Sequence, residues 1–61
     1  MIIPNKKLID MGFKKIQKTV HEKEFSYDWM RYSKGNSKLE VTTEYDLNGK
    51  PKLQYFDFNG E

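Results

Sequence analysis

The segment Tyr45–Phe58, YDLNGKPKLQYFDF, contains a turn signal between two runs of residues that favour β-strands. Its Asn-Gly step is typical of a tight hairpin turn, so we predict an antiparallel pair of strands here. The apolar residues of the second strand fall into two sets of opposite parity, Leu53 with Tyr55 and Phe56 with Phe58. Because successive side chains of a strand point to opposite faces, both faces of the sheet carry apolar groups that need cover.

Two turns compete in this hairpin and give different strand registers. A type I turn that ends in a left-handed glycine pairs Val41 with Tyr55 and places opposite charges across from each other. A two-residue turn pairs Val41 with Phe56 and places Glu40 across from Asp57. Facing like charges are unfavourable, so we expect the first register, which sends Phe56 to the face opposite Val41.

Upstream of the hairpin, the sequence changes from a helical to an alternating pattern. Asn5 favours a helix N-cap and Gly12 a helix end, after which Leu8 and Phe13 form the hydrophobic pair of a Schellman motif. From Lys14 onward the apolar residues alternate with polar ones, which is typical of strands. We predict an α+β fold, a short N-terminal helix packed on a four-stranded antiparallel β-meander, with the helix at about 5–12 and strands at about 13–21, 24–33, 37–46 and 51–58.

The composition fits one small domain over residues 1–61, in which a core can be only small. The chain has no cysteine, which excludes disulfides and thiol-based metal sites. The opening segment contains Pro4 and two lysines where a signal peptide needs an unbroken apolar run, and no stretch approaches the length of a membrane span. We therefore expect a cytoplasmic protein without membrane association.

The loop over residues 34–36 decides which aromatic side chains the helix covers. A three-residue loop pairs Trp29 with Val41 and builds an aromatic core under the helix, whereas a two-residue loop pairs Arg31 with Glu40 and exposes Trp29 and its neighbours. We expect the three-residue loop. A helix of two turns covers one face only, and an exposed apolar patch on the other face is typical of an interface. The predicted protein interface, with another protein or with a second copy in a homo-oligomer, consists of Met30, Tyr32, Phe56 and Phe58.

The distribution of charge leaves a second function open. Residues 1–23 contain six lysines and two acidic residues, so this third of the chain is basic. Lysine clusters attract phosphate backbones without sequence preference, although a single arginine in the chain disfavours base-specific recognition. The alternative prediction is a nucleic-acid-binding surface formed by Lys6, Lys7, Lys14, Lys15 and Lys18.

The sequence contains no combination of residues that is typical of a catalytic site. His21 is the one histidine, and a general base or a metal ligand needs a second positioned group. Glu40 and Glu44 lie about 13 Å apart along a strand, too far apart for a shared metal or a glycosidase pair. Phosphate-binding and nucleophile motifs are absent. We therefore predict that the protein is not an enzyme and needs no cofactor or metal.

Five features together resemble the small orphan proteins of bacteriophages and prophages. They are the capped helix end LIDMGF, the lysine-rich strand that follows it, the aromatic strand YDWMRY, the turn YDLNGK and the terminal FNGE. The resemblance spans the whole chain and is one of size and style rather than of a diagnostic motif. It implies an inhibitor or modulator of a host protein, including CRISPR and other defence machinery, that acts in the host cytoplasm.

Overall fold

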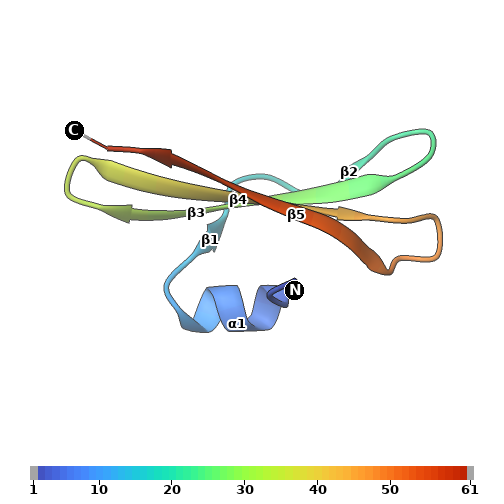
Figure 1. Cartoon of the computed structure of the whole chain (residues 1–61), viewed down its shortest axis with the longest axis horizontal. Helices are drawn as coiled ribbons and strands as arrows, with labels where there is room; N and C mark the ends of the chain where they lie inside the picture. Colours follow the sequence, from blue (N-terminus) through green and yellow to red (C-terminus); the bar gives the residue numbers. More distant parts are fainter. Residues whose placement is uncertain (1, 61) are drawn as a thin grey trace.

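The computed structural model describes residues 2–60 and consists of one helix and one five-stranded antiparallel sheet (Figure 1). The elements are α1 (Asn5–Asp10), β1 (Lys14–Lys15), β2 (Val20–His21), β3 (Ser26–Lys34), β4 (Ser37–Tyr45) and β5 (Pro51–Asn59). The predicted combination of a short helix with an antiparallel sheet is confirmed. The number of strands is not, because the predicted strand 13–21 is divided into β1 and β2. Met1 and Glu61, the ends of the predicted domain, lie outside the described residues.

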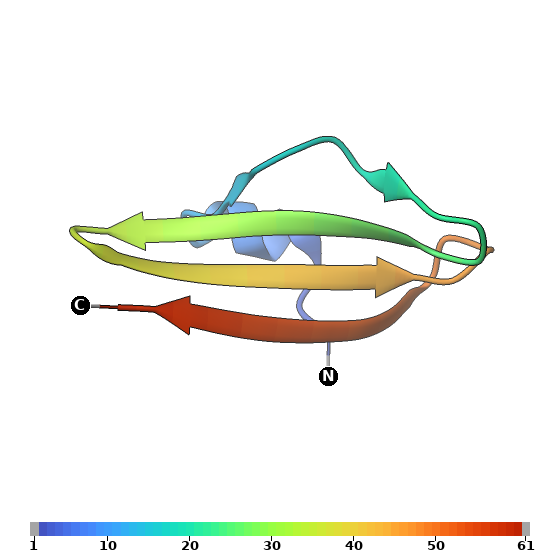
Figure 2. The same ribbon diagram turned by 90° about the horizontal axis from the view of Figure 1, so that it is seen from above.

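The division of the first strand follows from its pairing with β3. Lys15 pairs with Met30 and Val20 pairs with Tyr27, so four residues of the first segment face only two residues of β3. The extra residues bow out of the ladder between β1 and β2 (Figure 2). This detour brings the Thr19 hydroxyl to the Asp28 carboxylate, to which it donates a hydrogen bond of 2.5 Å. The hydrogen bond from Thr19 to Asp28 thus takes the place of two residue pairs between the first segment and β3.

The C-terminal end of α1 is a Schellman motif, as predicted. Gly12 has a left-handed φ of 109°, and its N–H donates to the Ile9 carbonyl at 3.0 Å. The N–H of Phe13 donates to the Leu8 carbonyl at 3.0 Å, and both side chains are buried. The apolar pair therefore fixes the helix end to the sheet, although the helix itself stops at Asp10, two residues before the predicted boundary.

The N-terminal end of α1 differs from the prediction. Pro4 occupies the N-cap position, Asn5 is the first helical residue, and no side chain caps the helix. The Asn5 amide instead donates to the Asp28 carboxylate at 2.7 Å and to the Tyr45 hydroxyl at 3.0 Å. Asn5 therefore anchors the helix to the sheet rather than satisfying the helix's own free N–H groups.

The predicted loop between β3 and β4 is wrong by one residue. Lys34 pairs with Ser37, which leaves a two-residue loop, and Arg31 pairs with Glu40 instead of facing Leu39. The guanidinium of Arg31 binds the Glu40 carboxylate at 2.7 Å. Because side chains alternate along a strand, the changed register turns Met30 toward the helix and Trp29 to the opposite face.

The turn between β4 and β5 is as predicted, but the register beyond it is not. The Gly49 N–H donates to the Asp46 carbonyl at 3.0 Å, and Gly49 has a left-handed φ of 82°. A bulge then leaves Lys52 without a partner in β4, and from there Val41 faces Phe56. The predicted pairing of Val41 with Tyr55 is therefore wrong.

The repulsion between Glu40 and Asp57, because of which we expected the other register, is relieved within the sheet. Glu40 does face Asp57, as the rejected register requires. The Arg31 guanidinium, however, binds Glu40 from the other side of β4 and offsets its charge. The like-charge pair is thus tolerated because one of its members already has a cationic partner.

The core lies where α1 crosses one face of the sheet, behind β3 in Figure 2. Its buried apolar residues are Leu8, Phe13, Met30 and Val41. Ile3 and Leu39 pack against this cluster and are partly buried. In the same view β5 lies outside the outline of the helix, so the helix-facing side of this strand has no cover from α1.

Candidate protein-contact surface

Three exposed aromatic side chains lie on the helix-bearing face, at and beside β5, and Tyr55 is exposed on the other face. Phe56 and Phe58 are 51% and 65% exposed, and Tyr32 is 36% exposed. Pairing of Leu39 with both Tyr32 and Phe58 brings β3, β4 and β5 together at this point. We name the surface formed by Tyr32, Leu39, Phe56 and Phe58 the aromatic surface.

The predicted interface residues share one face, but it is the face that carries α1. Phe56 and Phe58 therefore lie on the same side as Val41, not on the opposite side as expected. Met30 is 1% exposed and belongs to the core, so its predicted place on an exposed surface is wrong. The remaining three residues are exposed because α1 contains only six residues and the strands contain nine.

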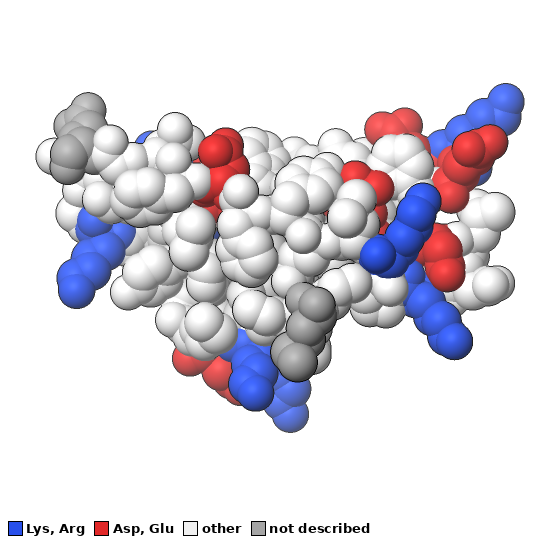
Figure 3. Space-filling view, in the orientation of Figure 1, with Lys and Arg blue, Asp and Glu red and all other residues white. Residues whose placement is uncertain are grey.

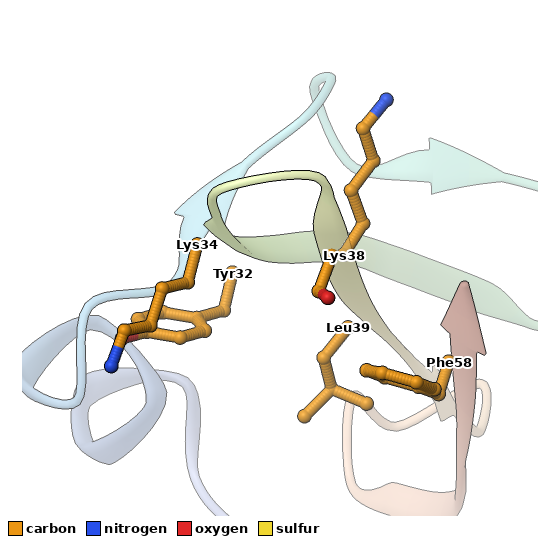
Figure 4. A pocket seen from close by; sticks show the side chains of 6 residues that line it. Tyr32, Lys34, Lys38, Leu39 and Phe58 are labelled. Carbon is orange, nitrogen blue, oxygen red and sulfur yellow. The ribbon is translucent and has the colours of Figure 1, made fainter. Parts of the chain in front are cut away.

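A hollow of about 260 Å³ opens within the aromatic surface, near the end of the β3–β4 hairpin (Figure 4). Leu39 and Phe58 lie on one side of it and Tyr32 on the other, while Lys34 extends along the Tyr32 ring and Lys38 points away. The surface of the hollow is almost wholly apolar, although Lys34, Ser37 and Lys38 also border it. It can therefore hold an apolar side chain from another molecule.

Two contacts hold the Tyr32 ring in place. The ring packs against Phe13 with centroids 5.6 Å apart, and it lies so close to Gly12 that a Cβ at this position would be 2.9 Å from a ring carbon. The Tyr32 ring thus contacts the C-terminal end of α1 and also forms one wall of the hollow. The hollow is present in the single chain.

On the opposite face, the aromatic side chains of residues 25–29 cover one another without a covering element, whereas Tyr55 of β5 is exposed. Phe25 and Tyr27 stack with centroids 6.2 Å apart, and the Arg31 guanidinium lies over the Trp29 ring at 5.8 Å. Tyr27 and Trp29 are consequently only partly exposed. This mutual cover concentrates the uncovered aromatic area on the helix-bearing face and along β5.

A polar cluster centred on Asp28 holds the helix against the sheet. The Asp28 carboxylate is buried and accepts hydrogen bonds from the Asn5 amide, the Thr19 hydroxyl and the Tyr45 hydroxyl at 2.7, 2.5 and 2.9 Å. The Lys15 ammonium lies 3.3 Å away. The sequence analysis did not predict this cluster. Its one signal was Asp28 itself, an acidic residue two positions before Met30 and therefore on the same face of the strand. The carboxylate is fully occupied by these donors, so its role is structural.

The same donors shift the pKa values of the cluster. Burial alone would raise the pKa of Asp28, but hydrogen bonds from Thr19, Asn5, Tyr45 and Lys15 outweigh it and lower this pKa below its usual value. Burial, together with the hydrogen bond to the Asp28 carboxylate, raises the pKa of the Tyr45 hydroxyl to about 12. The cluster is therefore stable with Asp28 charged and Tyr45 neutral.

We expect the raised pKa of Tyr45 to produce an alkaline loss of stability. An unfolded tyrosine ionises near pH 10, so the contribution of Tyr45 is complete below that value and disappears as the pH rises through about 12. Unfolding by urea should be measured between pH 9 and 12 for the wild type and for Tyr45→Phe. The variant should lose less stability over this range, and equal losses would contradict the assignment.

The structure does not bring the predicted lysines into one dense cluster. Lys6 and Lys7 are on α1, Lys14 and Lys15 on β1, and Lys18 in the following segment; all five are exposed. Lys15 is engaged by Asp28 and Thr19. In the space-filling view, the basic side chains are scattered over this face and acidic groups lie among them (Figure 3).

Other candidate sites receive no support from geometry. His21 is exposed at the end of β2. Among residues 2–60, no group of three or more histidine or acidic side chains is placed to hold a metal ion. In the same part of the chain, no helix has the length and apolar character needed to cross a membrane. Comparison with protein-family models, curated proteins and solved structures finds no match to this chain.

Proposed function

We propose that this protein is a non-enzymatic protein-interaction module that contacts its partner through the aromatic surface. The observation that supports this proposal most strongly is the exposure of Phe56 and Phe58 beside a preformed apolar hollow. An exposed apolar patch of this kind on a small protein is typical of a binding site. Burying the exposed part of each ring contributes about 1 kcal/mol to association, before the costs of binding.

The phage-like character of the sequence extends this proposal to a biological role. A small protein with such a contact surface can act by covering a functional site of a larger protein. We therefore propose an inhibitor or modulator of a host protein, with defence proteins as the first class to test. The hollow specifies the chemistry of the contact, which is an apolar side chain from the target placed between Tyr32 and Phe58.

Nucleic-acid binding through the lysines is the less supported function. The five lysines are spread over α1, β1 and the following segment, and Lys15 already has an acidic partner. A fluorescence titration with duplex DNA at two salt concentrations tests this function, because phosphate-driven affinity falls steeply with salt. Salt-dependent binding that Lys6→Glu and Lys14→Glu abolish would favour it over the protein-interaction proposal.

The proposed function is tested by capturing partners with Phe58→Glu and Leu47→Glu variants. Phe58 is 65% exposed and Leu47, at the other end of the sheet, is 78% exposed, so neither change should unfold the protein. We expect the wild type and Leu47→Glu to retain the same protein from a lysate of the natural host. Phe58→Glu should retain at least tenfold less, because a carboxylate in an apolar contact is costly. Equal capture by all three proteins would contradict the proposal.

A further inference from the structure

The side of the sheet opposite α1 carries no covering element among residues 2–60 (Figure 1). Tyr55 is the most exposed aromatic residue on this side, at 47%. The Tyr55 hydroxyl donates to the Glu44 carboxylate at 2.7 Å, so the ring is anchored at its outer end and is still open to solvent. We name the surface formed on this side by Trp29, Arg31, Glu40, Glu44, Tyr55 and Asp57 the helix-free face.

The positions around Tyr55 on the helix-free face carry negative charge. From the strand register and the alternation of side chains, the neighbours of Tyr55 on this side of the sheet are Leu53, Asp57, Glu40, Thr42 and Glu44. Three of these neighbours are acidic and none is basic. Figure 3, in which α1 lies below the sheet, shows acidic groups along the upper side of the molecule. An exposed aromatic ring bordered by carboxylates is complementary to a cation.

Arg31 shows which kind of cation suits this surface. Its guanidinium lies over the Trp29 ring at 5.8 Å and binds the Glu40 carboxylate at 2.7 Å. On the other side of β4, Tyr55 corresponds in register to Trp29, and a carboxylate, that of Asp57, stands where the first side has a guanidinium. Asp57 is exposed, and its carboxylate forms no ion pair or hydrogen bond with a side chain of residues 2–60. One half of the face thus has its own cation and the other half lacks one.

We propose that the helix-free face binds an arginine side chain of a partner protein, with its guanidinium beside the Tyr55 ring and paired with the Asp57 carboxylate. This contact lies on the opposite side of the sheet from the aromatic surface, so it goes beyond the proposed function. Arginine fits better than lysine, because a planar guanidinium can stack on a ring while it donates to a carboxylate. A nucleic acid fits less well, because its phosphates would meet the carboxylates of Glu40, Glu44 and Asp57.

The test is an NMR titration of the backbone amides at low salt with the peptide acetyl-Ala-Arg-Ala-Arg-Ala-amide. A second peptide carries citrulline, the neutral analogue of arginine, at both arginine positions. The arginine peptide should shift the amides of Tyr55, Asp57 and their partners on β4. The citrulline peptide should bind about fivefold more weakly, because it keeps the shape of the side chain but not the charge. Added salt should weaken the arginine peptide and leave the citrulline peptide unchanged.

Substitutions of exposed residues separate the roles of the ring and the carboxylate. Asp57→Asn and Tyr55→Leu should each weaken the arginine peptide about threefold, whereas Tyr55→Phe keeps the ring and should bind like the wild type. Asp10→Asn removes an exposed negative charge from α1 and is the control that should change nothing. Asp57 faces Glu40, so Asp57→Asn removes a repulsion and should leave the fold intact, which unchanged amide signals of α1 would show.

Several results would overturn the inference. Equal binding of the two peptides would show that the charge is not recognised, and equal binding by Asp57→Asn, Tyr55→Leu and the wild type would show that the site is elsewhere. No shift on β5 at millimolar peptide would also overturn it. A single-stranded oligothymidylate that shifts the same amides more than the peptide does would overturn it and assign the face to base stacking.

The variant Phe58→Glu separates this inference from the proposed function. Phe58 lies on the helix-bearing face, so Phe58→Glu should bind the arginine peptide like the wild type. If this variant loses the peptide, the peptide occupies the aromatic surface and the inference fails. If it keeps both the peptide and the host partner, the proposed function fails and the inference stands. If it loses the host partner alone, both stand.

Discussion

Asp28→Ala should lower the free energy of unfolding by about 3 kcal/mol, because it removes the acceptor shared by three hydrogen bonds and one ion pair. The Asn5 amide would lose one of its two acceptors. Since Asn5 belongs to α1 and Thr19 to the segment between β1 and β2, both would separate from β3. Urea denaturation followed by Trp29 fluorescence measures this loss.

Two controls show whether the cluster is responsible. Asp28→Asn keeps one carbonyl acceptor and nearly the same shape, so it should lose less stability than Asp28→Ala. Asp10→Ala removes an exposed carboxylate from α1, the helix that the cluster holds, and should change the stability by less than about 0.5 kcal/mol. An Asp28→Ala protein as stable as Asp10→Ala would show that the cluster does not hold the helix.

Leu8→Ala should have an effect of similar size, about 3 kcal/mol, through loss of apolar packing. Leu8 is fully buried and is the one buried residue of α1, whose six residues are too few to form a stable helix alone. Its truncation leaves a cavity above Met30 and Val41 and breaks the hydrophobic pair with Phe13. Thermal unfolding followed by circular dichroism should show a lower melting temperature and loss of the helical signal.

Ile9→Ala is the matched control for Leu8→Ala. Ile9 is adjacent on the same helix but is 57% exposed, so its truncation should cost less than about 0.5 kcal/mol. Because both substitutions produce alanine in a helix, differences in helix propensity are small. Equal destabilisation by the two changes would indicate that α1 does not dock through Leu8.

Local features of the fold could be predicted from the sequence because neighbouring residues determine them. The helix end at Gly12 and the turn that ends at Gly49 both depend on a glycine with a left-handed backbone, and both are confirmed. The registers could not be predicted in this way. The bulge at Lys52 and the partner of Glu40 depend on contacts across three strands, which no short stretch of sequence reveals.

The exposed residues of the candidate site could likewise be predicted only in part, because their faces depend on the strand registers. Phe56 and Phe58 are exposed as expected, but on the helix-bearing face, because the bulge shifts β5 by one residue relative to β4. Met30 is buried because the shorter β3–β4 loop turns it toward α1. The Asp28 cluster joins residues from five segments, so it becomes visible only after folding.

The central claim is that Phe56 and Phe58 form the contact with another chain. Fluorine NMR of protein carrying fluorophenylalanine at its four phenylalanine positions tests this claim directly, with a soluble paramagnetic agent to report exposure. In the dilute isolated chain, Phe56 and Phe58 should respond strongly and buried Phe13 should not. When the protein associates, at high concentration or with its host partner, Phe56 and Phe58 should become protected while Phe13 and Phe25 keep their response. Association that leaves both Phe56 and Phe58 as accessible as before would contradict the account.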